Sequence, residues 1–512
     1  MSKNLKITYN AISNFLRYAV YVVVTFVMTP FIVKNLGTSS YGMWVIILSV
    51  LGYAGILEMG VQTAVVKLVS QYHGANDLKS LNEVVGAALV FFAGAGLIVA
   101  LTCWAILPFF IDALVIDPSG RETVRQLLVI LGINVLFIFP NYVFSGLVYG
   151  FQAYHLKNLI DIASVVINAI LVYLLLSQGY GIFALAAVKT FGDIACLGAS
   201  YLLARKIFPG LKISILRAGA QRYRELFTLG GKIFWAATMS RIANNTEPLI
   251  ISFALSNTWT AIYAIPKRLI DYAKEVSWAL STGFMPMFSE IHGRNDFNSV
   301  RTIYFQYTRY LVLIIAPILF TIFVFGTPFI ALWIGEEFAS KGQIVVALLS
   351  AAFLTESLQP LVWRLFIGVD RVNLLVRVSS ISSIIYLLLA VALVWHYGIA
   401  GIALGNLIVA IICQAIFFTY TAKYLGTSVS HYLKECHLMP FVTSLMTLIL
   451  MLWLRHTWPP ISYTLLIQEV TASIIIYAVI SWVIALKGSE RAVVLEFVKS
   501  RFMAPAGEEG QQ

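Results

Sequence analysis

The chain has 512 residues, of which 60% are hydrophobic and only 12% are charged, and its mean hydropathy is +0.85. Soluble domains carry about 25% charged residues, so this composition excludes a chain of soluble domains and predicts a protein of the bilayer. The formal net charge is +11, and the four cysteines lie too far apart to suggest a disulfide framework or a metal site.

Apolar segments long enough to cross a membrane recur along the whole chain. The first, residues 18–33, follows basic residues but lacks the cleavage pattern of a signal peptide, so we expect it to be the first spanning helix. A window of about 19 residues predicts about 14 spanning helices of ~20 residues. Their centres lie near Val23, Leu51, Gly94, Phe137, Ala169, Ile194, Ile242, Ala273, Ile315, Ala352, Leu388, Ile408, Leu448 and Ile475. The segments around Arg241 and Lys267 are the weakest, because polar residues interrupt them.

Lysine and arginine are unevenly divided between the two sets of connecting loops. One set holds only Lys34, Arg121, Arg125, Lys341 and Arg455, and the alternate set holds most of the others. The positive-inside rule therefore predicts a multi-pass protein with both termini in the cytoplasm. The basic connector 205–225 is interpreted as a linker on the cytoplasmic leaflet, with recruitment of a substrate as the alternative.

A polar phrase occurs twice in the chain at one fixed offset. Six residues of the first copy recur 219 positions later, which pairs Ser70, His73, Gly74, Asn76, Asp77 and Ser80 with Ser289, His292, Gly293, Asn295, Asp296 and Ser299. The offset predicts a duplicated half of six helices, with both phrases on the cytoplasmic side, as in a parallel repeat. The glycine of each phrase is expected to allow a tight turn with positive φ.

The repeat and the charge pattern together predict five parts of the chain. These are an N-lobe of helices 1–6 (1–204), a basic cytoplasmic linker (205–225), a C-lobe of helices 7–12 (226–425), helices 13 and 14 (426–486), and a cytoplasmic tail (487–512). Prolines inside the spans, among them Pro30 and Pro248, are expected to bend the helices that line a cavity.

Polar side chains inside the predicted spans indicate a hydrated central cavity, because a charge at the bilayer centre costs about 3 kcal/mol or more unless it faces protein or water. The basic residues expected to bind an anionic group are Lys267, Arg268, Arg241, Lys274 and Arg364. The other polar residues expected to line the cavity are Asn14, Tyr18, Tyr21, Glu58, Gln62, Asn244, Asn245, Glu247, Asp271 and Gln359. The alternative is that Asp271 and Glu275 neutralise the neighbouring bases as internal ion pairs, as we expect for Lys189 and Asp193.

Catalytic motifs do not occur in the sequence. The seven histidines lie in predicted loops or at helix ends, and no metal-ligand spacing, Walker A loop or nucleophile elbow is present. We therefore expect a protein that is not an enzyme, that needs no cofactor or metal, and that has no nucleic-acid partner.

Four stretches of the sequence resemble a known family. They are TPFIVKNLGTSSYGMW (Thr29–Trp44), LEMGVQTAVVKLVSQY (Leu57–Tyr72), GFQAYHLKN (Gly150–Asn158) and LWIGEEF (Leu332–Phe338). The chain resembles, over nearly its whole length, the bacterial polysaccharide flippases of the multidrug/oligosaccharidyl-lipid/polysaccharide exporter superfamily. Glu58 stands where the usual family phrase has an aspartate, which keeps the charge.

The resemblance implies an all-α integral membrane protein with two pseudo-symmetric six-helix lobes around a central cavity and two further helices. It implies transfer of undecaprenyl-pyrophosphate-linked oligosaccharides, such as O-antigen or capsule units, across the bacterial inner membrane by alternating access. Membrane lipids, an H⁺ or Na⁺ gradient, a polysaccharide polymerase and a chain-length regulator are the implied partners.

Two other functions stay open. One is a small-molecule exporter of the same fold, for which a cavity that binds cations would be acidic rather than basic. The other is a membrane glycosyltransferase or polymerase, which would need a sizeable outer loop with acidic or arginine motifs, whereas the outer loops of this chain are short.

Overall fold

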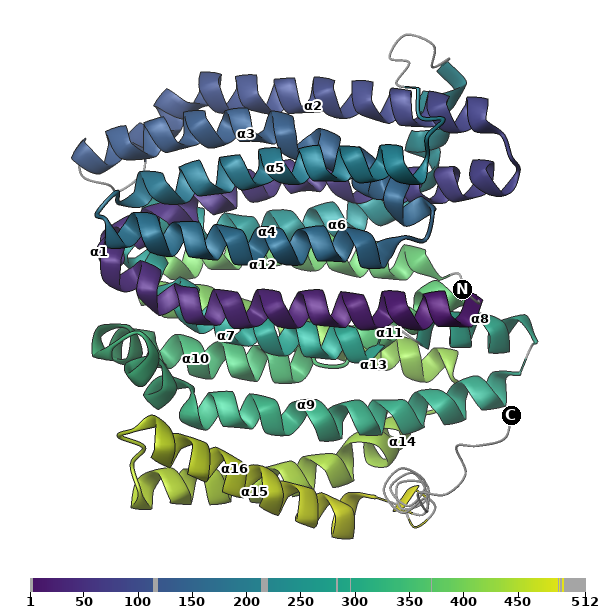
Figure 1. The fold of residues 1–512 in the computed structure, drawn as a ribbon. Coiled ribbons are helices and arrows are strands. Elements are labelled where there is room, and N and C mark those ends of the chain that lie inside the picture. Colours follow the sequence, from purple (N-terminus) through teal and green to yellow (C-terminus); the bar gives the residue numbers. More distant parts are fainter. Residues whose placement is uncertain are drawn as a thin grey trace, which may run out of the picture. The chain divides into compact units, whose positions relative to one another are not determined.

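The computed structural model describes residues 3–113, 118–212, 220–281, 284–294, 296–369, 371–486, 488 and 490–491. Every regular element in these ranges is a helix, as Figure 1 shows, and the expected all-α membrane fold is confirmed. The first nine helices are α1 (Lys3–Gly74), α2 (Leu78–Ala113), α3 (Pro118–Gly150), α4 (Tyr154–Ser177), α5 (Ile182–Ile207), α6 (Ala220–Ala254), α7 (Asn257–Ser281), α8 (Phe284–Gly293) and α9 (Phe297–Trp333). The others are α10 (Glu336–Glu356), α11 (Gln359–Gly368), α12 (Val372–Tyr397), α13 (Ile399–Tyr424), α14 (Val429–Leu433), the π-helix η1 (Lys434–Leu438), α15 (Met439–Thr457), α16 (Tyr463–Ile480) and the π-helix η2 (Ser481–Ala485).

Eleven stretches of the described chain are long and apolar enough to span a membrane. The helices α6 and α7, which carry the polar segments around Arg241 and Lys267, are not among them. The count of 14 therefore stays a prediction.

The first helix, α1, is 72 residues long and is broken at Gly37. At a rise of about 1.5 Å per residue, an unbroken helix of this length would be several times longer than a hydrocarbon core of ~30 Å. Gly37 has φ 79° and ψ 162°, a conformation that is accessible to glycine because it has no Cβ. Pro30 stays inside the helix, so the break in α1 lies seven residues after the proline expected to bend it.

The chain divides into two compact units. Unit 1 comprises Met1–Ile265 and Asn373–Val409, and unit 2 comprises Pro266–Val372 and Ala410–Gln512. The lobe boundaries expected from the repeat stay a prediction.

Unit 1 has an apolar core between α1, α2 and α3, which run side by side. Val69 of α1, Val85 and Phe92 of α2, and Phe139 of α3 are almost completely buried there. Helix α6 also packs along α1, and a second core joins Ile46 to residues of α3, α5 and α6. These contacts bury the apolar faces that the sequence places in the membrane.

Unit 2 has an apolar core between α9, α15 and α16. Val324 and Phe325 of α9 and Met451 of α15 are fully or almost fully buried in it. The Arg455 side chain of α15 donates a hydrogen bond to the backbone carbonyl of Val324, with 2.6 Å between Nη1 and O. The last two spanning helices are therefore fixed against α9 by both apolar and polar contacts.

Candidate functional site

The predicted basic face lies on α7, within unit 2. Lys267 and Arg268 are half-buried, and Lys274 forms an ion pair with Glu356 of α10, with 3.6 Å between Nζ and Oε2. The Lys274 ammonium also lies 5.6 Å from the centre of the Phe353 ring, where a cation is attracted by the π-electrons. The partner of Lys274 is thus a carboxylate of another helix rather than Asp271 or Glu275 of its own.

Arg364 of α11 lies beside the same end of α7. Its guanidinium carbon is 5.4 Å from the centre of the Trp278 ring, and its buried Nε atom has no hydrogen-bond partner among the described residues. The Ser277 hydroxyl donates to the carbonyl of Ser357 at 2.8 Å, which joins α7 to the turn between α10 and α11. A stacked guanidinium with an unpaired donor keeps capacity to bind a carboxylate or phosphate.

We call Lys267, Arg268, Lys274 and Arg364 the basic group of unit 2. The acidic side chains of α7 and of the last turn of α10 are Asp271, Glu275 and Glu356, so four bases stand against three acids. Gln359, also expected in the cavity, is half-buried at the first position of α11. The structure therefore brings Lys274 and Arg364, which are 90 positions apart in the sequence, to one junction of α7, α10 and α11.

The other predicted residues of the seventh segment lie on α6, within unit 1. Arg241 is half-buried. Asn245 packs closely against Gly52 of α1, where a Cβ atom would lie 2.6 Å from the amide nitrogen of Asn245. Glu247 is fully buried and accepts a hydrogen bond from the Tyr386 hydroxyl of α12. The side chains of Asn244 and Glu58 lie outside the described part of the structure.

The polar residues predicted on the first helix lie on α1, near α4. The Asn14 side chain accepts a hydrogen bond from the buried Asn158 amide of α4 at 2.8 Å. The other three predicted residues of α1 are exposed (Tyr21) or half-buried (Tyr18 and Gln62).

Two of the ion pairs described in unit 1 join residues four positions apart on one helix. The pair of Lys189 with Asp193, predicted from their spacing, is confirmed at 3.0 Å, and Asn134 of α3 also donates to Asp193 at 2.8 Å. The pair of Lys157 with Asp161 in α4 was missed, because Lys157 was counted with the loop residues although its side chain is only 4% exposed. Its signal in the sequence was the same i, i+4 spacing of opposite charges.

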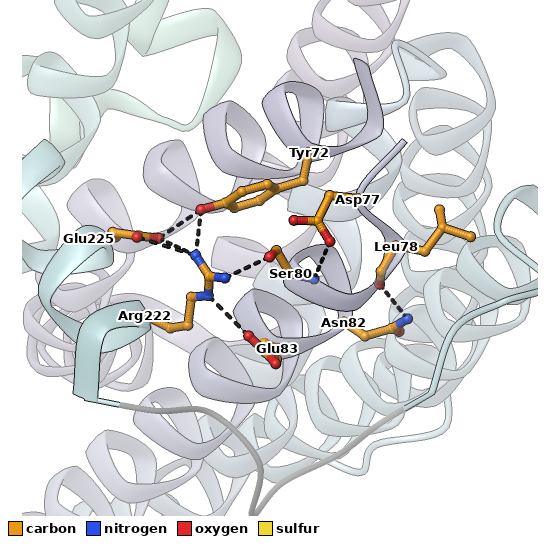
Figure 2. Close-up of polar contacts among 8 residues, drawn as sticks. All are labelled: Tyr72, Asp77, Leu78, Ser80, Asn82, Glu83, Arg222 and Glu225. Carbon is orange, nitrogen blue, oxygen red and sulfur yellow. Dashed lines mark hydrogen bonds and ion pairs between the residues drawn. The ribbon is translucent and has the colours of Figure 1, made fainter. Parts of the chain in front are cut away.

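The first copy of the repeated phrase is held by an arginine from the linker. Figure 2 shows Arg222 surrounded by Tyr72, Ser80, Glu83 and Glu225. The guanidinium donates to the Glu83 carboxylate at 3.1 Å, to the Tyr72 hydroxyl at 2.6 Å and to the Ser80 hydroxyl at 2.6 Å. Burial alone would lower the pKa of Arg222, but the hydrogen bonds to Glu225 and Glu83 outweigh it and raise the pKa above its ordinary value. No pattern in the sequence predicts this cluster, although the charged residues themselves are evident there.

Both copies of the phrase start the next helix in the same way. The carboxylate of Asp77 accepts a hydrogen bond from the Ser80 backbone N–H at 3.0 Å, and Asp296 accepts one from Ser299 at the same distance. This is the geometry of an N-cap, and the serine hydroxyl and N–H lower the pKa of each carboxyl group. In the first copy, positive φ occurs at Asn76 (φ 55°), whereas Gly74 is the last helical residue of α1. The expectation that Gly74 supplies the positive φ was therefore wrong.

The helices define the class of the protein as a multi-pass helical membrane protein. The structure titled "Lipid II flippase MurJ, inward closed conformation" is similar with a TM-score of 0.75 and 14% identity, covering 95% of this chain and 99% of that chain. An inward-facing multidrug resistance MATE family transporter of the MOP superfamily is similar with a TM-score of 0.69 and 14% identity, covering 80% and 94%. These likenesses show that the chain shares the fold of these two proteins.

The family follows from the sequence match. The model of the family described as "Polysaccharide biosynthesis protein" matches residues 32–341, more than half of the chain, and the chain belongs to this family. "Uncharacterized membrane protein EpsK" of Bacillus subtilis is 22% identical over 96% of this chain and 98% of its own length. "Putative O-antigen transporter" of Shigella flexneri is 20% identical over 78% of this chain and 94% of its own length. The resemblance to polysaccharide flippases noted in the sequence is thus confirmed.

Proposed function

We propose that this protein moves an undecaprenyl-pyrophosphate-linked oligosaccharide from the cytoplasmic to the outer leaflet of the bacterial inner membrane by alternating access, for surface polysaccharide synthesis. The name of the Shigella relative and the family match support a polysaccharide substrate. The observation that carries the proposal is the basic group of unit 2, because its four bases outnumber the three acidic residues of α7 and the last turn of α10. An oligosaccharide exporter of this kind transports its substrate and performs no covalent chemistry on it.

The electrostatic argument favours an anionic ligand. At an effective dielectric constant of 20, opposite unit charges 4 Å apart attract by about 4 kcal/mol, which is comparable to or larger than the cost of about 3 kcal/mol for inserting one lysine or arginine. A pyrophosphate carries at least two charges, so it can interact with more than one residue of the basic group. Arg241 of unit 1 is proposed as an additional cation that acts on the same ligand.

The orientation and the partners belong to the same proposal. We infer cytoplasmic termini from the loop charges, and transport driven by an H⁺ or Na⁺ gradient from the chemistry of moving a charged lipid in one direction. A polymerase and a chain-length regulator would act on the glycan after it reaches the outer leaflet.

The test is complementation of a bacterial strain that lacks its own oligosaccharide flippase. Surface glycan, normalised to the amount of protein in the membrane, should fall at least tenfold for Lys267→Ala, Arg268→Ala, Arg241→Ala and Arg364→Ala, since each removes a charge that meets the pyrophosphate. Lys341→Ala is the matched control, because Lys341 is exposed and pairs with Glu337 at the start of α10. Normal display by all four variants at normal abundance would contradict the proposal and favour the interpretation as internal ion pairs.

A further inference from the structure

A row of polar side chains is buried along the last spanning helix. Glu469, Ser473 and Tyr477 of α16 and Ser481 of η2 follow one another at intervals of four residues, so they lie on one helix face. Their exposed fractions are 6%, 0%, 6% and 7%. This face therefore points into the protein, although apolar residues alone would be enough to pack it.

Glu469 is a buried carboxylate that lacks a partner. Both of its oxygen atoms are inaccessible to solvent and have no hydrogen-bond partner among the described residues. The neighbouring residues Leu466 and Val470 belong to the apolar core formed with Met451 and Val324. The carboxyl group thus lies in an environment made mostly of hydrocarbon.

The elements packed against α16 offer Glu469 no positive charge in the described structure. They are α9, α15 and η2, and neither η2 nor residues 310–333 of α9 contain a charged residue. The charged residues of α9 are Arg301 and Arg309 near its start, and Arg309 forms an ion pair with Glu490. Helix α15 carries Arg455 and His456 near its end, and the Arg455 guanidinium donates to the carbonyl of Val324. On α16 itself the other titratable groups are Tyr463 and Tyr477, whose hydroxyls donate to the carbonyls of Leu332 and Leu313.

Hydroxyl groups extend from Glu469 along the interface of α15 and α16. Three of these hydroxyls are buried without a hydrogen-bond partner in the described part of the chain. They belong to Ser473 of α16, Ser481 of η2 and Ser444 of α15. By contrast, Thr447 is satisfied by its own helix, because its hydroxyl donates to the carbonyl of Thr443 at 3.0 Å. The unpaired hydroxyls share a buried region with the Glu469 carboxyl group, but no hydrogen bond among the described residues connects them to it.

We propose that Glu469 is a proton-binding site within unit 2 and that it holds a proton at neutral pH. A neutral carboxylic acid avoids the desolvation cost of an unpaired anion in an apolar site. A metal cation fits less well, because it would need several oxygen ligands, whereas Met451, Leu466 and Val324 offer none from their side chains.

Infrared spectroscopy of the full-length protein in lipid nanodiscs tests the site without any substrate. At pH 7 the wild type should show the C=O band of a protonated carboxyl group, and Glu469→Gln should lose it. Glu337→Gln is the matched control, because Glu337 is exposed and paired with Lys341, so this variant should keep the band. If Glu469→Gln does not fold, Glu469→Asp should shift the band instead.

The inferred site is overturned if the band persists unchanged in the Glu469 variants. It is also overturned if the band disappears when NaCl replaces choline chloride at constant pH, since the ligand would then be Na⁺.

The role of the proton in transport rests on the proposed function and is tested by a separate measurement. Surface glycan per molecule should fall at least tenfold in Glu469→Gln and stay normal in Glu337→Gln. Normal display by Glu469→Gln would exclude proton coupling through this residue, whereas the infrared result would be unaffected by a different substrate.

Discussion

Arg222 stabilises the turn between α1 and α2, although it lies far from this turn in the sequence. The guanidinium forms hydrogen bonds with two carboxylates and two hydroxyls, and it lies 5.1 Å from the centre of the Tyr72 ring. Its side chain is only 16% exposed, so these interactions are screened less than those of a surface ion pair. Hydrogen bonds to charged groups contribute about 1.5–3 kcal/mol each, although bonds within one network are not additive.

We predict that Arg222→Ala lowers the apparent melting temperature of the purified protein. Its removal leaves Glu83 and Glu225 close to each other without the cation between them, and the destabilisation should be about 1.5–3 kcal/mol. Lys206→Ala is the matched control, because Lys206 is exposed in the last turn of α5, and it should melt like the wild type. Equal melting of the two variants would show that the network contributes nothing to stability.

The turn between α1 and α2 explains why one residue-level prediction was wrong. Glycine is the usual residue at positive φ, which made Gly74 the natural candidate. Asparagine also tolerates this region, because its short polar side chain can interact with the local backbone, and in this turn Asn76 takes the position. The dipeptide Asn-Asp therefore makes the turn and the helix cap together, and the glycine before it ends a helix without needing positive φ.

The part of α1 after Gly37 and the first residues of α7, which belong to unit 1, approach each other closely at Gly42. A Cβ atom there would lie 1.8 Å from the backbone carbonyl oxygen of Asn257, at the start of α7. The Asn257 amide donates to the hydroxyl of Ser39 at 2.8 Å and to its carbonyl at 3.0 Å. The second arm of α1 and the start of α7 are therefore held in backbone contact.

We predict that Gly42→Ala destabilises the protein by about 1–3 kcal/mol, because the backbones must separate to admit the methyl group. Gly94→Ala is the matched control, since a Cβ atom at Gly94 of α2 meets nothing within 4 Å. Thermal unfolding in detergent should show a lower midpoint for the first variant and an unchanged or higher one for the second. A normal midpoint for Gly42→Ala would contradict the close approach.

The apolar pattern of the sequence predicted helices well where apolar residues dominate. It predicted them poorly where polar residues of one helix are hydrogen-bonded by residues of another. Helices α2, α3, α9, α12 and α13 each contain one of the predicted centres, namely Gly94, Phe137, Ile315, Leu388 and Ile408. The polar helices α6 and α7 were harder to place, because the residues that satisfy them come from distant parts of the chain. Glu247 is paired with Tyr386, 139 positions away, and no local pattern indicates such a partner.

The same reason limited the prediction of the candidate site. The charges of the basic group were evident from the sequence, but the contacts of Lys274 with Glu356 and of Arg364 with Trp278 depend on how α7, α10 and α11 pack. Glu469 was overlooked because it is a single charge in an otherwise apolar helix. Its regular spacing with Ser473, Tyr477 and Ser481 was the available signal.

For the whole molecule we predict that both copies of the repeated phrase face the cytoplasm. In a variant without its native cysteines, Asn76→Cys and Asn295→Cys should react with a membrane-impermeant maleimide only after the cells are opened. Glu337→Cys, in the first turn of α10 on the side predicted to be external, should react in intact cells. Labelling of either phrase from outside would contradict the parallel repeat.

The two described ends of the linker 205–225 bind neighbouring residues of α2. Asn82 donates to the carbonyl of Gly210 and accepts from the N–H of Lys212, and Glu83, the next residue, holds Arg222. Both described ends of the linker, at residues 210–212 and at Arg222, are therefore anchored to adjacent residues of one helix of unit 1. Loss of Asn82 would release the first end and loss of Glu83 would weaken the second, so the two substitutions should loosen the same connection from opposite sides.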